Sequence, residues 1–335
     1  MLTKFLLCLF LGLLMNYAVS DVSARIVQRI VGGHLAQPGR FKHQVSLEGW
    51  HERSCALHFC GCSILDERHI LTAAHCVAEH SSFNFVAITI VAGTTDLRNK
   101  SSGIYRDVDR IYLPPTYFLN APHEENDDIA LLRLRRPLPL GTDERVRAVN
   151  LPKFDQYKPP AKRLATMSGF GTYSQDKRGG QVVFGKMSPR LKYIIGRINE
   201  SNDPPCTEKQ VCVQTVTDKG PCKVRRSNLF IFLILMEFEF NANNSFEFKG
   251  DSGGPLTDES TNTLIGVGSE KTRELCGTVT KYTRVSEYLD FINKAMAGKL
   301  EYNKKLFTYI EYKDFKHEGI IEQVQHCHQI AEEEE

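Results

Sequence analysis

The sequence lacks an excess of charge of either sign. Its 335 residues carry 42 basic and 40 acidic side chains, a formal net charge of +2, and the basic residues are scattered among acidic neighbours. Nucleic-acid binders concentrate basic residues on one face, so no nucleic-acid partner is expected. Hydrophobic residues make up 41% and charged residues 24% of the chain, which is typical of a globular protein with one large or two ordinary domains.

The amino-terminal apolar run is too short to span a membrane. Lys4 precedes the run from Phe5 to Met15, and the small residues Ala18 and Ser20 follow it. A membrane helix needs about 20 apolar residues, whereas this pattern is typical of a secretory signal peptide. We predict a signal peptide over residues 1–20, a secreted, extracellular protein and no membrane association, with a membrane anchor as the alternative.

The cysteines lack the paired CxxC spacing of structural zinc sites, and the histidines are dispersed. Cys8 would leave with the signal peptide. Nine cysteines remain, at positions 55, 60, 62, 76, 206, 212, 222, 276 and 327. In an oxidising compartment most of them should be paired, with one left over. We therefore expect disulfide bonds, no metal and no cofactor.

From Phe41 onward, short apolar runs alternate with turn residues, which predicts many short strands. The clearest are Gln44–Leu47, Gly61–Leu65, Phe85–Ala92, Ile129–Leu134, Ala165–Gly169 and Leu264–Val267. Helical periodicity is convincing only near Glu287 to Ala297, where Tyr288, Phe291, Ile292 and Ala295 fall on one face. The pattern predicts an all-β body with one terminal helix.

Three short motifs carry candidate catalytic residues. Ser252 lies in Gly250-Asp-Ser-Gly-Gly-Pro255, and a serine hydroxyl needs a base and oxyanion donors to act as a nucleophile. His75 lies in Leu-Thr-Ala-Ala-His-Cys, where a histidine considered alone is more often structural. Asp128 precedes Ile-Ala-Leu-Leu; it is costly to bury without a partner such as an imidazolium, and could equally begin a turn. The three motifs together favour catalysis.

Four motifs in order resemble those of the chymotrypsin-like (S1 family) serine proteases. They are Ile30-Val-Gly-Gly, Leu-Thr-Ala-Ala-His75-Cys, Asp128-Ile-Ala-Leu-Leu and Gly250-Asp-Ser-Gly-Gly-Pro-Leu. The chain is most similar to insect chymotrypsin-like enzymes, and the resemblance covers residues 30–297. It implies an all-β fold of two six-stranded antiparallel β-barrels with a C-terminal α-helix.

The resemblance also implies a role for each motif. Ser252 would attack the scissile carbonyl and His75 would take its proton, while Asp128, preferred to Asp127 because it directly precedes Ile-Ala-Leu-Leu, would orient the histidine. The backbone amides of Gly250 and Ser252 would form the oxyanion hole.

An activation step is implied at the start of the protease domain. Residues 21–29 would be a propeptide removed by a trypsin-like protease after Arg29, with the bond after Arg25 as a weaker candidate. The new ammonium group of Ile30 would then pair with Asp251. His58 matches a position that can hold this aspartate in a zymogen.

Three disulfides are implied by the resemblance: Cys60–Cys76, Cys206–Cys212 and Cys222–Cys276. A fourth family bridge is absent at both ends, where Ala165 and Asp258 stand. The resemblance gives no partner for Cys55, Cys62 or Cys327, and a Cys55–Cys62 bond is one of the arrangements left open.

Residues Val224 to Lys249 interrupt the family pattern, because Cys222-Lys223 would join naturally to Gly250. This stretch contains the apolar run from Leu229 to Met236. It is interpreted as a membrane-inserting loop, a genuine insertion or a retained intron, and the intron is favoured because both ends can be encoded by splice sites.

The specificity pocket is less well defined by the sequence. With the insert removed, Gly220 falls at the pocket floor, and Ser269 begins Ser-Glu-Lys in the cleft wall, where the family usually has Ser-Trp-Gly. Absence of an acidic residue at the pocket floor disfavours cleavage after Arg or Lys, so a chymotrypsin-like preference for large apolar residues is expected.

Two kinds of segment lie outside this site. Asn99, Asn199 and Asn243 begin Asn-x-Ser sequons, which carry a glycan or stay bare. The charged residues 298–335 are predicted to form a solvated C-terminal tail.

The function predicted from these observations is a secreted serine endopeptidase made as a zymogen. The alternative is a catalytically silent serine protease homologue that binds or regulates another protein. Expected partners are protein or peptide substrates, the activating protease and protein inhibitors, and a monomer is expected.

Overall fold

The computed structural model describes residues 33–50, 57–78, 87–117, 127–155, 157–171, 175–178, 181–184, 187–199, 206–215, 251–269, 279–300 and 309–311. The predicted signal peptide, propeptide and insert lie outside the described residues. The individually named positions Arg29, Ile30, Cys55, Gly220, Cys222, Asn243, Gly250, Cys276 and Cys327 also lie outside the described residues. In the described part of the chain, no helix is long and apolar enough to cross a membrane.

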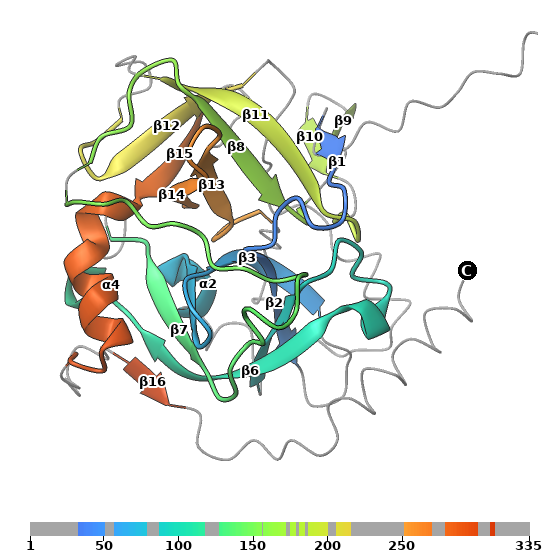
Figure 1. Cartoon of the computed structure of the whole chain (residues 1–335). Helices are drawn as coiled ribbons and strands as arrows, with labels where there is room; N and C mark the ends of the chain where they lie inside the picture. The colour runs from blue at the N-terminus through green and yellow to red at the C-terminus, as the bar shows by residue number, and fades with distance from the viewer. Residues whose placement is uncertain are drawn as a thin grey trace, which may run out of the picture.

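The first barrel is built from six antiparallel strands: β2 (Gln44–Trp50), β3 (Leu57–Ile64), β4 (His69–Thr72), β5 (Ala87–Ala92), β6 (Ile104–Tyr112) and β7 (Ala130–Leu134). Their order is β6-β5-β2-β3-β4-β7, and pairing of β6 with β7 closes the circle (Figure 1). Strand β4 is fully buried and β3 nearly so, because one face fills the barrel and the other is covered.

The second barrel closes in the same way from β8 (Leu164–Gly169), β11 (Lys192–Asn199), β12 (Gln210–Gln214), β13 (Pro255–Asp258), β14 (Thr263–Gly268) and β15 (Val279–Arg284). Strand β1 (His34–Leu35) pairs with β11, and β9 (Gln175–Arg178) forms a hairpin with β10 (Gln181–Phe184). The predicted fold class, two six-stranded antiparallel barrels, is confirmed.

In the described part of the chain, α2 (Ala74–Ala78) lies directly after β4 and α4 (Leu289–Met296) after β15. The predicted terminal helix is thus present, although its first turn is the 3₁₀-helix η4 (Val285–Tyr288). Short 3₁₀-helices also occur at η2 (Lys100–Ser102) and η3 (Pro115–Tyr117). Leu289, Ile292 and Ala295 of α4 join the core of the first barrel, although α4 follows the second barrel in sequence.

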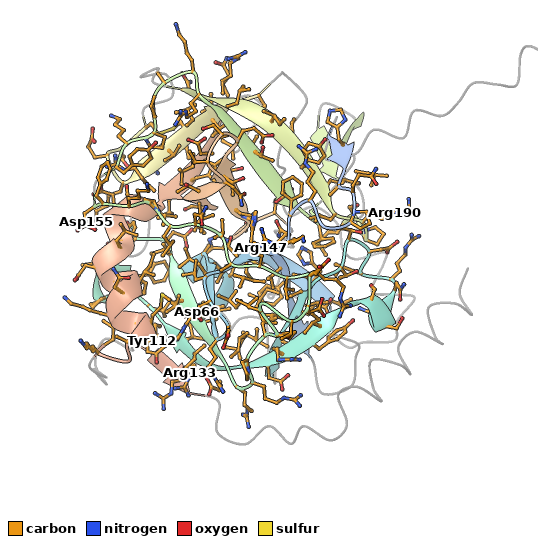
Figure 2. All side chains as sticks on the ribbon, in the orientation of Figure 1. Asp66, Tyr112, Arg133, Arg147, Asp155 and Arg190 are labelled. Carbon is orange, nitrogen blue, oxygen red and sulfur yellow. A yellow bond between two sulfur atoms is a disulfide. The ribbon has the colours of Figure 1, made fainter. Side chains whose placement is uncertain are left out.

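Between the barrels, the connection that contains Arg147 crosses from one to the other, and side chains fill the space around it (Figure 2). Its backbone amide donates to the Lys42 carbonyl at 3.0 Å. The N-terminal segment before β2 is thereby bonded to the connection.

Part of the segment predicted to be a C-terminal tail forms a strand. Residues 309–311 form β16 (Tyr309–Glu311), which pairs antiparallel with residues 110–112 of β6. Among the described residues, strand β5 pairs with residues 104–107 of β6, so in this part of the chain the same edge is open at residues 110–112. Strand β16 occupies that open edge.

The position of the absent fourth disulfide is occupied by an ion pair. Ala165 and Asp258 lie directly opposite each other in the β8–β13 pair. Asp258 is buried, and Arg163 Nη1 donates to its Oδ2 at 2.9 Å, while Ser260 Oγ donates to its Oδ1 at 2.7 Å. A buried carboxylate needs such partners, and polar contacts here join the strands that a covalent bond would join.

Candidate active site

The structure brings His75 and Asp128 together in the first barrel. His75 lies on α2, and Asp128 lies just before β7. The His75 backbone amide donates to Asp128 Oδ1 at 2.8 Å, and His75 Nδ1 is 2.7 Å from Asp128 Oδ2. Both residues are buried. Strand β4 pairs directly with β7, with Thr72 opposite Ala130, so the two side chains are placed by neighbouring strands.

Two residues of the second barrel complete the environment of Asp128. Ser269 Oγ donates to Asp128 Oδ2 at 2.7 Å, and Thr283 Oγ1 donates to its carbonyl oxygen at 2.9 Å. Burial would raise the pKa of Asp128, but the charge of His75 and hydrogen bonds from His75 and Ser269 outweigh burial and hold the pKa below its ordinary value. The carboxylate is therefore ionised at neutral pH.

Asp127 faces a different set of partners. Its Oδ1 accepts hydrogen bonds from Lys209 Nζ at 2.7 Å and from Tyr288 Oη at 2.8 Å, and its φ is 66°. Burial would raise the pKa of Asp127, but these hydrogen bonds outweigh it and lower the pKa. No local sequence signal pointed to Lys209 or Tyr288, because each is distant in sequence from Asp127.

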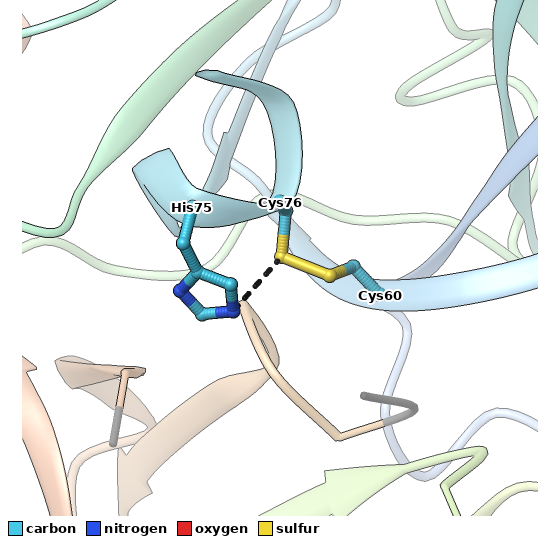
Figure 3. Close-up of side chains that lie close together, drawn as sticks. All are labelled: Cys60, His75 and Cys76. Carbon is cyan, nitrogen blue, oxygen red and sulfur yellow. Dashed lines mark hydrogen bonds between the residues drawn. A yellow bond between two sulfur atoms is a disulfide. The ribbon is translucent and has the colours of Figure 1, made fainter. Parts of the chain in front are cut away.

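A disulfide anchors the helix that carries His75. Cys60 of β3 is bonded to Cys76 of α2, and His75 Nε2 lies 3.7 Å from Cys76 Sγ (Figure 3). These three side chains are close enough together to suggest a metal site. Both sulfurs are committed to the disulfide, however, so they are not the thiolates that a metal would need.

The loop around Ser252 packs against strands β3 and β4. The Ser252 carbonyl accepts from the Gly61 amide at 2.7 Å, and Gly253 has a φ of 74°. A Cβ on Gly253 would lie 2.2 Å from Thr72 Oγ1 and 2.5 Å from the Gly61 carbonyl. Glycine is therefore required next to Ser252. No hydrogen bond joins Ser252 Oγ to His75 Nε2 among the described residues.

Asp251 points toward the end of β8. Its Oδ1 accepts from the Gly171 amide at 2.9 Å, and a Cβ on Gly169 or Gly171 would come within 2.3 Å of the carboxylate. His58 contacts Phe170, the residue between these two glycines: the rings meet edge-on at 5.6 Å, and His58 Nδ1 is 2.8 Å from Ser46 Oγ.

The other cysteines that the structure describes are Cys62, Cys206 and Cys212. Cys206 and Cys212 form a disulfide, while Cys62 is free and buried. The Cys55–Cys62 arrangement considered from the sequence is therefore wrong, because Cys62 points into the first-barrel core. Burial raises the pKa of the Cys62 thiol, so it is held in its unreactive protonated form.

Comparison with known proteins gives the family. The trypsin family model matches residues 30–224. The chain belongs to the trypsin family. This confirms the resemblance to the chymotrypsin-like serine proteases, and the match stops where the predicted insert begins. Family membership implies a peptidase hydrolase with protein substrates.

Two relatives extend the similarity beyond the family match. Coagulation factor IX of Oryctolagus cuniculus is 30% identical over 273 residues, 78% of this chain and 83% of the relative. Serine protease SP24D of Anopheles gambiae is 30% identical over 281 residues, 80% of this chain and 81% of the relative.

Solved structures support the trypsin-family fold. Human heparin binding protein aligns with a TM-score of 0.57 at 21% identity, covering 79% of this chain and 96% of that protein. Neuropsin, a serine protease expressed in the limbic system of mouse brain, gives 0.56 at 22%, covering 79% and 98%. At this identity the likeness concerns the fold alone.

Proposed function

We propose that this chain is a secreted serine endopeptidase with a His75, Asp128 and Ser252 triad. The observation that carries the proposal is the buried hydrogen bond between His75 Nδ1 and Asp128 Oδ2 at 2.7 Å. In a neutral imidazole, a proton on Nδ1 that is bonded to a carboxylate leaves the lone pair on Nε2, which is the tautomer that a general base requires. The packing of the Ser252 loop on β3 and β4 supports the third member.

In the proposed reaction, Ser252 Oγ attacks the scissile carbonyl while His75 Nε2 takes its proton. The amides of Gly250 and Ser252 stabilise the oxyanion of the tetrahedral intermediate. His75 then protonates the leaving amine, and water attacks the acyl-enzyme with the same base. Asp128 stabilises the imidazolium in both halves of the reaction.

Activation is proposed to follow cleavage after Arg29. Residues 1–20 are the signal peptide, 21–29 the propeptide, 30–297 the protease domain and 298–335 the tail. The new ammonium of Ile30 would pair with Asp251 and order the amide of Gly250. The glycines at 169 and 171 support this step, because they leave room for the Asp251 carboxylate at the end of β8.

Specificity is proposed to be chymotrypsin-like, because no acidic residue occupies position 220 at the expected pocket floor. The Ser269 hydroxyl donates a hydrogen bond to Asp128. It therefore contributes more to the proposed triad than to recognition of the substrate side chain. Protein inhibitors are the further partners proposed for the monomer.

A catalytically silent homologue is the second candidate. The observation that favours it is that, among the described residues, no hydrogen bond joins Ser252 Oγ to His75 Nε2. The sequence also predicts an insert of 26 residues directly before Gly250. An insert there would shift Ser252, and a positioning error of about 1 Å can lower the rate about a hundredfold.

A fluorophosphonate probe separates the two candidates. The secreted chain would be labelled after limited tryptic activation, beside Ser252→Ala and beside a variant that lacks residues 224–249. Labelling of the full chain that is lost in Ser252→Ala supports the endopeptidase. A correctly cleaved and folded chain that stays unlabelled supports the silent homologue, and labelling of the deletion variant alone assigns the defect to the insert.

A further inference from the structure

One sequon occupies an exposed turn beside a surface groove. Asn99 lies in the connection between β5 and β6, at the residue before the 3₁₀-helix η2, and is exposed. The turn is well defined, because the Ser102 amide and hydroxyl both donate to the Asn99 carbonyl, at 3.1 and 2.7 Å. A sequon in a surface loop of a secreted protein is a glycosylation acceptor.

The side chains of this sequon are arranged to present the amide nitrogen. Ser101 Oγ donates to Asn99 Oδ1 at 2.8 Å. That bond fixes the carbonyl side of the amide toward the turn and leaves Nδ2 on the other side. Asn99 Nδ2 makes no hydrogen bond with any residue that the structure describes, so attachment of a sugar there breaks no contact of this part of the fold.

The sequon at Asn199 offers a contrasting environment. Asn199 is the last residue of β11, is half-buried, and lies opposite Cys212 in the β11–β12 ladder. Cys212 is itself bonded to Cys206. A bulky, solvated glycan suits an exposed turn much better than a half-buried strand end beside a disulfide.

We propose that Asn99 carries an N-linked glycan, an inference that rests on the secretory route in the proposed function. Asn99 Nδ2 attacks the anomeric carbon of an oligosaccharide carried on a polyprenyl diphosphate. The N–C bond forms, the bond from that carbon to the diphosphate oxygen breaks, the diphosphate leaves with the electron pair, and Nδ2 loses one proton.

The surroundings of Asn99 suit the first sugars of this glycan. Asn99 lines a groove of about 570 Å³ together with Pro38, Phe41, Thr94, Thr95 and Ser102. An aromatic ring and several hydroxyl groups are the surfaces that a sugar ring contacts, through its apolar face and its hydroxyls. The first sugars therefore lie along this groove.

The glycan protects the peptide bond that precedes it. Arg98 directly precedes Asn99, and its side chain is 54% exposed. A trypsin-like protease that cleaves after Arg29 would also recognise an arginine in an exposed turn. Arg98 pairs with Asp96 at 2.6 Å and Lys100 with Glu48 at 3.8 Å, but the Lys100 side chain is only 22% exposed, so Lys100 is the poorer target. A glycan on Asn99 blocks access to the Arg98–Asn99 bond.

Glycan mapping tests the assignment. The full chain would be secreted from a eukaryotic host as wild type, Asn99→Gln, Asn199→Gln, Ser101→Ala and Ser101→Thr, and its peptides would be analysed by mass spectrometry before and after glycan removal with peptide N-glycosidase. We expect a glycan at Asn99 that is lost in Asn99→Gln and Ser101→Ala and kept in Asn199→Gln and Ser101→Thr. A secreted wild type with bare Asn99 overturns the proposal.

Limited trypsin digestion of the same proteins tests the protective role. Cleavage after Arg98 should be at least about tenfold faster in Asn99→Gln than in wild type, because cleavage of a folded chain follows access to the bond. Cleavage after Arg29 should be unchanged, and Arg98→Gln/Asn99→Gln should regain resistance in this turn. Equal cleavage after Arg98 in wild type and Asn99→Gln overturns the protective role.

Fluorophosphonate labelling of Ser252 on these samples keeps the two proposals separate. A glycan at Asn99 on a secreted chain that stays unlabelled supports this inference and overturns the proposed catalysis. Labelling of a secreted chain with a bare Asn99 supports the proposed catalysis and overturns this inference.

Discussion

The two halves of the candidate site are held by different kinds of interaction. The His75 half belongs to the first barrel, where a disulfide and two buried hydrogen bonds fix it: Cys76 is bonded to Cys60, and His75 is bonded twice to Asp128. The Ser252 half lies just before β13 of the second barrel. It is fixed mainly by backbone contacts, such as the hydrogen bond from the Gly61 amide to the Ser252 carbonyl at 2.7 Å.

This difference determines what can vary in each half. Bonds within the first barrel place His75 regardless of what precedes Ser252. The position of Ser252 depends on glycines that let backbone approach backbone, such as Gly253 against Gly61. In the proposed triad, a change next to Ser252 would therefore affect the nucleophile and leave His75 and Asp128 in place.

The largest effect is expected at the centre of the His75 half. Asp128→Asn keeps the shape of the side chain but removes the charge and the tautomer preference, and should lower kcat about 10⁴-fold. Asp127→Asn is the matched control and should change kcat only a few-fold, because Asp127 faces Lys209 and Tyr288. Peptide-substrate kinetics after activation measure both, and a larger loss in Asp127→Asn would reverse the assignment.

The next largest effect is expected in the Ser252 half. Gly253→Ala would place a methyl group 2.2 Å from Thr72 Oγ1 at a φ of 74°, and the resulting shift of Ser252 should lower kcat/KM about a hundredfold. Gly141→Ala is the control, since its φ is 83° but nothing lies within 4 Å of the added carbon. It should lower stability by about 1 kcal/mol and leave kcat/KM unchanged. Equal kcat/KM losses would contradict close packing as the cause.

A buried histidine should make the stability of the first barrel depend on pH. Burial lowers the pKa of His43 from 6.5 to about 4. Above pH 6.5 both folded and unfolded chains hold it neutral; below that the unfolded chain gains a proton and the folded chain does not, so stability falls between pH 6.5 and 4.

Replacement of His43 measures this contribution. Between pH 7 and pH 5 the wild type should lose about 2 kcal/mol of unfolding free energy through His43. His43→Phe should remove that part of the slope, as measured by urea unfolding at each pH. An identical slope in the variant would mean that other groups carry the acid sensitivity.

The smallest effect is expected at the ion pair of the second barrel. Ala165→Cys/Asp258→Cys should form a disulfide, because the two positions are opposed in the β8–β13 pair. The gain in unfolding free energy should be about 1 kcal/mol net, since the contacts of Asp258 with Arg163 and Ser260 are lost. Denaturation with and without reductant measures it, with Asp258→Cys alone as the control. No gain over that single variant would show that the polar contacts replace the bridge fully.

Much of the fold could be predicted from apolar runs. The runs at 44–47, 129–134 and 264–267 fall within or overlap β2, β7 and β14, because short runs with apolar residues between turn residues are typical of strands. Asp128 could also be chosen over Asp127 from the family resemblance, because it directly precedes Ile-Ala-Leu-Leu, and the structure places its carboxylate against His75.

Other elements could not be predicted from apolar runs, because their positions depend on residues that are distant in sequence. Strand β6 carries charges in its interior, and their partners lie on neighbouring strands, as in the pair of Arg133 with Asp109 at 2.6 Å. Strand β16 has only three residues, and its place depends on an open edge nearly 200 positions earlier. The Lys209 and Tyr288 contacts to Asp127 likewise arise only when two barrels meet.

The position of α4 has a consequence for how the chain is made. Its residues complete the apolar core of the first barrel, yet they leave the ribosome after the whole second barrel. The apolar core of the first barrel therefore remains incomplete until synthesis is almost finished. A product truncated anywhere before residue 289 would expose apolar surface from the first barrel. Chaperones and proteases would therefore recognise it as incompletely folded, even though the His75 half of its site had already been translated.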